Sequence, residues 1–591
     1  MTSIDELFKR PNLPSTGINP ANNKRKYDSL DAQSAYKSAK LSPTSDVKGK
    51  TNGQAYVEEG EDDMEAGPEL PPDEEEEAVD DEEGRFFGGG VTKNTTAAMD
   101  FIDQADGENY VAEKIDAAWL RRLALSFEKN ISRNSELRAK YEHDPSKFMA
   151  SEADLDAEIK SLSILSEHPN LYPEFAKIGC AGSLVSLLAH ENTDIAIDAI
   201  EIISELTDED VAADPEDWNV LVAAFLENDL VSLIVQNFDR LDETLESDRN
   251  GIYHALSILE NFASSADIAA KIGGGEVLKW LLQRIKVKEQ PISQNKQYAA
   301  EVLQVLLQSS PKVRDEFIKS DGSDTLLTLL ASYRKRDPEN DSTEEEYAED
   351  LFDALTVTLA SPAGKKSFVD AEGVELALIM VKEGRFSKTR ALKLLDHAMA
   401  GSSDESRVAA EKIVEFAGLK TLFGTFMKDK GKDKAALEHL IGIFSALLRL
   451  LPGDSSQRIR TLAKFVEKDF EKLNKSVALR FDYAARVRFA RAQITADKKQ
   501  MSKQEQEETE GDMFSRLMDA GLYCLQTLDV ILSWLAAEDV GARKRIAELL
   551  KDRDESLNYL KKSLQEQLSG IDADEEGNAG EMLQALIDCL S

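Results

Sequence analysis

Acidic residues recur at helical spacing between residues 194 and 205. Asp194, Asp198, Glu201 and Glu205 follow one another at intervals of four, three and four residues, which places their side chains in one row along a helix. Such a row of carboxylates can hold the lysine and arginine side chains of a peptide. The alternative interpretation is an ordinary solvated helix surface that needs no ligand.

The pattern closest to a catalytic one is the dipeptide formed by Asp396 and His397, since a carboxylate can tune a histidine base. Adjacent residues point in different directions on a helix, and no nucleophile stands at a recognisable spacing. The segment 49–51, Gly-Lys-Thr, imitates the end of a phosphate-binding loop, but Thr44 occupies the position of its first glycine. We therefore expect no catalysis and no nucleotide binding.

Residue types that bind structural metals are scattered along the chain. The three cysteines lie far apart without a Cys-x-x-Cys pair, and the six histidines show no metal-ligand spacing. We therefore expect no metal, no cofactor and no disulfide, in a chain suited to a reducing compartment.

The net charge is -40, from 71 basic and 111 acidic residues. This charge repels the nucleic-acid backbone and favours basic partners, although excess acid can also serve solubility alone. No apolar stretch approaches the roughly 20 residues of a membrane-spanning helix, and the N-terminus lacks a secretory pattern. We expect a soluble protein without direct nucleic-acid contact and without a membrane span.

One basic stretch could contradict the expectation about nucleic acid. Arginines and aromatic residues alternate there, as in surfaces that stack RNA bases. They are Arg480, Phe481, Tyr483, Arg486, Arg488, Phe489 and Arg491. We favour the alternative, in which Phe481, Val487 and Ala490 are core positions and the arginines pair with acidic groups or with a partner protein.

Residues 1–110 are poor in large apolar side chains and contain acidic runs between residues 58 and 83. This composition is typical of disordered segments. The tail also carries a basic cluster that resembles a bipartite nuclear import signal, although isolated lysines in a flexible tail are the alternative. The cluster consists of Lys24, Arg25, Lys26, Lys37 and Lys40.

From about residue 115 the chain becomes rich in leucine and alanine at helical spacing, with few strand signals. In residues 154–167, for example, Leu155, Ile159, Leu162 and Leu165 share one helical face. Residues 181–207 then show a short helix, a polar turn and a longer amphipathic helix. Comparable units follow in residues 228–263, 273–308, 321–360, 371–401 and 416–451.

The long helices of these units recur every 43 to 54 residues or so, close to the roughly 40–47 of armadillo and HEAT units. Such units bury their apolar stripes only against their neighbours, so they stack into a right-handed superhelix. We predict an all-α repeat array at 171–452, an N-terminal helical cap at 111–170 and a C-terminal cap region at 453–591.

The last amphipathic segment, residues 513–537, is expected to form one helix. Its apolar residues are Leu517, Leu522, Leu525, Leu528 and Ile531. This helix should cap the array or join it to another subunit, and a homodimer is one arrangement that it allows.

In armadillo arrays the last helix of each unit lines a shared concave face. The acidic row should therefore continue onto the corresponding positions of the next two long helices, to form a groove for basic segments. These positions are Asn250, His254, Ser257, Asn261, Glu301, Gln304 and Gln308.

Several segments sharpen the armadillo pattern into a specific resemblance. They are residues 147–208, from "KFMASEADLDAEIKSL" to "IISELTD", and then "LIVQNFDRLDET", "ALKLLDHAM", "FAGLKTLFGTFMK", "ADKK" and "LMDAGLYCLQ". In this order they resemble the family of beta-catenin-like protein 1 over roughly residues 115–560. The resemblance implies a nuclear armadillo protein with helical caps, which associates with the nineteen complex of the active spliceosome and binds basic localisation segments.

The expected function is therefore a non-catalytic nuclear scaffold in pre-mRNA splicing. A nuclear transport adaptor for basic signals is the alternative within binding proteins, but its array of tryptophans with asparagines four residues later is missing. We expect the four tryptophans, Trp119, Trp218, Trp280 and Trp534, to be packing residues. A regulatory subunit of the ubiquitin system or of a kinase is an alternative of another class.

Overall fold

The computed structural model describes residues 114–429, 431, 433–502, 505–506, 509–570 and 578–590. Within these residues the secondary structure consists of α-helices and short 3-10 helices, without strands. The predicted all-α class is confirmed. The acidic tail and the import-like cluster (Lys24, Arg25, Lys26, Lys37 and Lys40) lie outside the described residues.

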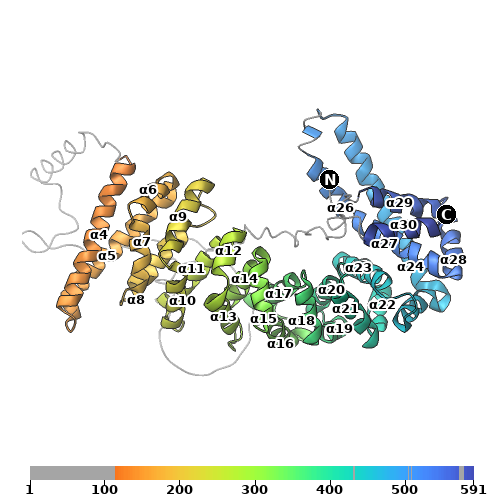
Figure 1. Cartoon of the computed structure of the whole chain (residues 1–591), viewed down its shortest axis with the longest axis horizontal. Helices are drawn as coiled ribbons and strands as arrows, with labels where there is room; N and C mark the ends of the chain where they lie inside the picture. The colour runs from red at the N-terminus through yellow and green to blue at the C-terminus, as the bar shows by residue number, and fades with distance from the viewer. Residues whose placement is uncertain are drawn as a thin grey trace, which may run out of the picture. The chain divides into compact units, whose positions relative to one another are not determined.

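Between Tyr172 and Leu450 the described helices form triplets, each with a first, a second and a third helix (Figure 1). The first helices are α6 (Tyr172–Lys177), α9 (Pro215–Glu227), α12 (Ala266–Ile272), α15 (Pro311–Lys319), α18 (Pro362–Asp370) and α21 (Asp404–Glu415). The second helices are α7 (Cys180–Ser186), α10 (Leu230–Arg240), α13 (Gly275–Arg284), α16 (Gly322–Leu330), α19 (Gly373–Glu383) and α22 (Gly418–Lys428). The third helices are α8 (Thr193–Leu206), α11 (Glu246–Phe262), α14 (Gln294–Ser309), α17 (Thr343–Thr358), α20 (Phe386–Ala398) and α23 (Lys434–Leu450).

Further helices precede and follow the triplets. Before them lie α4 (Ala117–Lys140), η2 (Pro145–Lys147), α5 (Met149–Ser161), η3 (Leu162–Glu167) and η4 (Pro169–Leu171), while η5 (Leu187–Ala189) extends α7 and η6 (Ala331–Arg334) extends α16. After them lie α24 (Ser456–Lys498), α26 (Glu510–Asp519), α27 (Leu522–Glu538), α28 (Val540–Lys551), α29 (Leu557–Ser569) and α30 (Asn578–Cys589). Helix α24 is bent, because residues 467–470 leave the helical conformation.

Each third helix packs on the third helix of the next unit, from α8 through α11, α14, α17 and α20 to α23 (Figure 1). Helix α5 extends this row before α8, and α27 extends it after α23. We call the row from α5 to α27 the third-helix row. Its apolar side chains belong to one continuous core, so each unit is stabilised by its neighbours.

The turn between the first and second helix of a unit requires a left-handed residue. The φ angle is 53° at Asp321 and 59° at Glu372, and glycine follows each of them. A Cβ atom on Gly322 or Gly373 would lie 2.4 Å from the ring of the phenylalanine at the end of the first helix. The glycine of the repeat pattern is therefore explained by backbone that passes directly over an aromatic ring.

The prediction of a single helix over residues 513–537 is wrong. The segment forms two helices, α26 and α27, which meet at Gly521 with a φ angle of 90°. A Cβ atom there would lie 2.4 Å from the ring of Tyr483 on α24, so close packing imposes the break. Helix α27 packs against α23 and α24, and its Leu528 and Ile531 are buried in the core.

None of the described helices is by itself both long enough and apolar enough to cross a membrane. Two bent pairs, α9 with α10 and α26 with α27, meet the criteria of length and composition only together.

The glycine contact can be tested with two alanine substitutions in the same unfolding assay. Gly373→Ala should destabilise the protein by about 1–3 kcal/mol, because the new methyl group overlaps the Phe368 ring. Gly424→Ala, in the interior of α22 with open space around it, should be neutral or stabilise by about 0.5–1 kcal/mol. Equal thermal midpoints for Gly373→Ala and the unsubstituted protein would contradict the packing argument.

Candidate partner-binding face

Helix α8 carries the predicted acidic row on the side opposite the core. Ala199, Ile202 and Leu206 are buried, as the spacing predicts. Asp194 and Glu201 are exposed, and neither has an ion-pair partner among the described residues. Their carboxylates are therefore available to a ligand.

Asp198 lies in the junction between α8 and α5. Its carboxylate is 3.4 Å from the ammonium of Lys160, which also pairs with Asp156. Burial and the hydrogen bond with Asp156 raise the pKa of Asp198 to about 7, and the same hydrogen bond lowers the pKa of Asp156. The two carboxyl groups thus share a proton near neutral pH, because two close negative charges repel each other.

Glu205 lies at the last turn of α8, where two hydroxyl groups donate to its carboxylate. The Ser163 Oγ is 2.6 Å away and the Ser166 Oγ 3.1 Å away. On the adjacent helix α11, burial lowers the pKa of His254, while the negative charges of Glu201 and Glu205 oppose this shift. The structure thus brings His254 near the acidic row, and the binding of a partner there stays a prediction.

Two of the predicted polar positions on α11 do not lie on an open surface. Ser257 and Asn261 are buried, and the Asn261 Nδ2 donates to the Ser204 carbonyl O and the Thr207 Oγ1, each at 3.4 Å. The prediction that Ser257 and Asn261 line an open groove is therefore corrected, since they join neighbouring helices. Asn250 is half-buried, and its Oδ1 has no hydrogen-bond partner among the described residues.

The polar row continues on α14, where Gln304 donates to Gln308 at 3.0 Å. Here one amide bridges two carboxylates: the Gln297 Nε2 lies 3.0 Å from the Glu301 Oε2 and 3.0 Å from the Asp350 Oδ2. Burial and the negative charge of Glu301 raise the pKa of Asp350 well above its ordinary value. This is a second close pair of carboxyl groups in the third-helix row.

Sequence reasoning missed Asp156 on α5 and Asp350 on α17. The signal for Asp350 was present, because Glu346, Asp350 and Asp353 repeat the spacing of four and three residues seen on α8. Asp156 could be found only from the packing of α5 on α8, since it pairs across helices.

The carboxylates of α17 that face α20 are neutralised by the protein itself. Arg390 on α20 pairs with Glu349, and the Lys393 ammonium is 2.6 Å from Asp353. The acidic part of the third-helix row that remains therefore extends from Asp156 on α5 to Asp350 on α17, with Lys160 as a cation inside it. We call this part the acidic face.

Asp396 has a partner on another helix. The Asp396 Oδ2 lies 3.1 Å from the Nδ1 of His439 on α23, and both side chains are buried. This pair joins α20 to α23. Its observed role is therefore to link two units.

The four tryptophans, Trp119, Trp218, Trp280 and Trp534, pack against the core, as predicted. Trp280 stacks on Phe238 with 3.8 Å between ring centroids. Trp218 meets Phe262 edge to face and donates to the Thr207 carbonyl O.

The arginine-aromatic stretch is divided between the core and the surface. Arg480 is buried between Asp529, at 2.7 Å, and Glu555, at 2.5 Å. Phe481, Val487 and Ala490 are core positions, as we favoured. The exposed Phe489 faces away from this core. Arg480 is thus a structural residue of the C-terminal helices.

Among the described residues there is no group of three or more histidine, cysteine, aspartate or glutamate side chains that could hold a metal ion.

The sequence of this chain matches one known protein family over most of its length. The family described as "Catenin-beta-like, Arm-motif containing nuclear" matches residues 96–565. The chain belongs to the catenin-beta-like family. A "Beta-catenin-like protein 1 homolog" of Schizosaccharomyces pombe is 37% identical over 474 residues, which are 80% of this chain and 82% of that protein.

Vertebrate members of the catenin-beta-like family are similar over the same region. The human "Beta-catenin-like protein 1" is 34% identical over 470 residues, 77% of this chain and 82% of its own length. A crystal structure of an engineered protein covers 45% of this chain and 96% of its own, with a TM-score of 0.34 and 18% identity. The family resemblance found in the sequence is confirmed by the family match and by the S. pombe and human relatives.

The shared proton of Asp198 predicts a pH-dependent effect of Asp198→Asn. Because the pKa of Asp198 is raised in the folded state, folding is penalised as pH rises from about 4 through 7. Asparagine cannot ionise, so the stability of Asp198→Asn relative to the unsubstituted protein should increase between pH 5 and pH 8, by about 1–3 kcal/mol. Thermal melting over this pH range measures the difference.

Asp194→Asn, on the same helix but exposed, provides the control. Its stability relative to the unsubstituted protein should not change over this range. Parallel behaviour of the two variants would rule out a shared proton at Asp198.

Proposed function

We propose that this protein is a nuclear scaffold in pre-mRNA splicing, which binds basic segments of partner proteins on the acidic face and catalyses no reaction. The partners we propose are splicing proteins of the nineteen complex. The observation that carries the proposal is the accumulation of carboxylates along the third-helix row, on α5, α8, α14 and α17, with Lys160 as the cation that pairs with Asp198. The family description, which names nuclear armadillo-motif proteins, supports the nuclear setting.

The arrangement favours a cation for an electrostatic reason. Asp156 lies close to Asp198, and Glu301 lies close to Asp350. In each pair the pKa of the second carboxyl group is raised, so it keeps its proton at a higher pH than an isolated carboxyl group would. A lysine or arginine side chain placed beside such a pair stabilises its ionised form. A peptide with several basic residues gains this effect at more than one place along the acidic face.

Peptide binding should depend on the carboxylates of α8. A fluorescein-labelled peptide with the sequence Gly-Lys-Lys-Arg-Lys-Gly should lose affinity about tenfold or more for the triple variant Asp198→Asn, Glu201→Gln, Glu205→Gln, because three attractive charges are removed. For the unsubstituted protein the affinity should rise from pH 6 to pH 8, as Asp198 ionises. Fluorescence anisotropy measures both effects.

The matched control removes three exposed carboxylates from the first and second helices, in the variant Glu227→Gln, Asp239→Asn, Glu276→Gln. Equal losses in both triple variants would show that the peptide senses only the net charge.

In cells, the tagged protein purified from RNase-treated nuclear extract should retain nineteen-complex proteins, and the α8 variant should retain fewer. Import receptors with diverse cargo, in place of splicing factors, would favour the transport alternative.

Entry into the nucleus is proposed to depend on the basic cluster of the tail. Removal of residues 24–40 takes away Lys24, Arg25, Lys26, Lys37 and Lys40 and should lower the ratio of nuclear to cytoplasmic fluorescence of a tagged protein. Removal of residues 58–74, an acidic segment of equal length, should not. Unchanged nuclear accumulation without residues 24–40 would refute the role of the cluster.

A further inference from the structure

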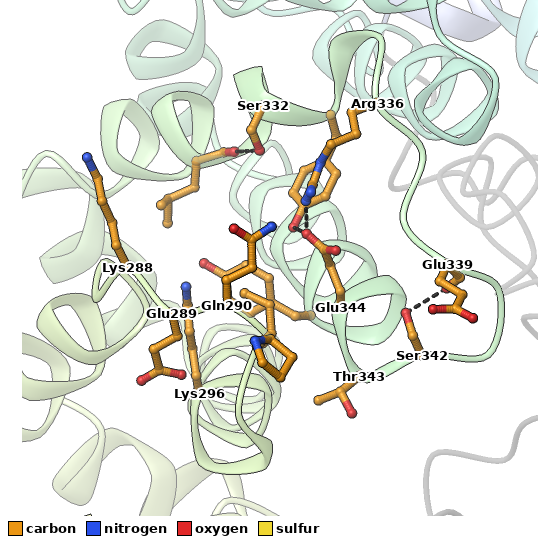
Figure 2. A pocket seen from close by; sticks show the side chains of 15 residues that line it. Lys288, Glu289, Gln290, Lys296, Ser332, Arg336, Glu339, Ser342, Thr343 and Glu344 are labelled. Atoms are coloured by element: carbon orange, nitrogen blue, oxygen red, sulfur yellow. Dashed lines mark hydrogen bonds and ion pairs between the residues drawn. The ribbon is translucent and has the colours of Figure 1, made fainter. Parts of the chain in front are cut away.

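A pocket of about 490 Å³ lies between two loops that precede third helices (Figure 2). Residues 288–292 before α14 form one side, and η6 with residues 336–344 before α17 forms the other. In repeat proteins, a loop that is longer than the packing of neighbouring helices requires often carries a functional site. The pocket is separate from the residues of the acidic face.

Lys296 lines the pocket as a buried residue, 5% exposed (Figure 2). Its Nζ donates to the Val287 carbonyl O at 2.7 Å and lies 4.7 Å from the centroid of the Tyr347 ring. Burial lowers the pKa of Lys296. An ammonium has three N–H groups, so the one hydrogen bond found among the described residues leaves it short of acceptors.

The carboxylates next to this ammonium are largely committed to other partners. Glu289 lies 2.7 Å from Arg284 and accepts from the Ser293 Oγ at 2.6 Å. Glu344 pairs with Arg336 and accepts from the Tyr333 hydroxyl at 3.1 Å. The negative charge of Glu289 also acts on Lys296, but Glu289 is shared with Arg284 and Ser293.

Two charged groups remain at the exposed rim. Lys288 has no partner among the described residues, and Glu339 is the remaining carboxylate. Figure 2 shows Lys288 on the side of Lys296, whereas Glu339 lies beyond Ser342 on the opposite side. On the side of the pocket where Lys296 lies, the charged group without an ion-pair partner is therefore the ammonium of Lys288.

The rest of the lining suits the stem of an amino-acid side chain. Tyr333 and Tyr347 are buried in the wall, and Ile292 and Leu329 add apolar surface. The first turn of α17 also reaches the pocket through Thr343. This turn carries Glu344, Glu345 and Glu346, which offset the partial positive charge of the helix N-terminus, so the attraction for an anion comes from the lysines.

We propose that this pocket receives a single anionic side chain, of glutamate or phosphoserine, from a polypeptide segment of a partner, with Lys296 and Lys288 as its cationic contacts. A polynucleotide is a poorer fit, because a chain of phosphates would be repelled by the net charge of -40. A single anion on a polypeptide avoids most of this repulsion. This inference is independent of the proposed binding of basic segments.

The test uses the full chain and fluorescein-labelled peptides Gly-Leu-X-Gly-Gly, in which X is phosphoserine, glutamate or serine. Anisotropy titration should give tighter binding for phosphoserine and glutamate than for serine. Lys288→Gln and Lys296→Met should each weaken phosphoserine binding about five- to tenfold, because each removes a charged contact. Lys279→Gln, an exposed lysine of α13 outside the pocket, should bind like the unsubstituted protein.

Lys288 is exposed, so Lys288→Gln keeps the test meaningful if Lys296→Met fails to fold. The proposal is overturned if phosphoserine and serine peptides bind equally, or if folded Lys288→Gln retains full affinity. It is also overturned if inorganic phosphate binds at the pocket and neither anionic peptide does, or if a single-stranded oligoribonucleotide displaces the phosphoserine peptide at equal concentration.

Discussion

The packing of each third helix on the next is the interaction on which the rest of the structure depends. A unit of three helices has apolar side chains on surfaces that only its neighbours can cover, so the core from α4 to α30 is one continuous cluster. The acidic face exists because this packing brings residues from α5, α8, α14 and α17 together. The same packing sets two loops beside each other to form the pocket of Figure 2.

Buried polar contacts tie successive units to one another along the array. Asn261 donates to the end of α8, the Arg284 guanidinium meets Glu243 with two hydrogen bonds of 2.7 and 2.8 Å, and His439 lies against Asp396. An unpaired buried polar group costs far more than a paired one, so a shift of one unit along its neighbour would break these contacts. Apolar stacking supplies the stability, and the polar contacts fix the register.

Charge is distributed unevenly over the third-helix row. On α8 the exposed carboxylates have no internal cation, whereas Arg390 and Lys393 neutralise the carboxylates of α17 that face α20. The pocket beside Lys296, with Lys288 at its rim, adds the proposed site of opposite character. One scaffold can thus hold a basic segment and an anionic side chain at different places.

The sequence by itself determined the helical class, the repeated units and the acidic row on α8, because helical spacing and turn residues are local properties. It also identified Phe481, Val487 and Ala490 as core positions, through the same periodicity. Only the tertiary structure decided which polar residues meet across helices: Asp156 joins Asp198, and His439 joins Asp396. It also buried Ser257 and Asn261 and broke the last predicted helix at Gly521, since contacts between distant segments leave no local pattern.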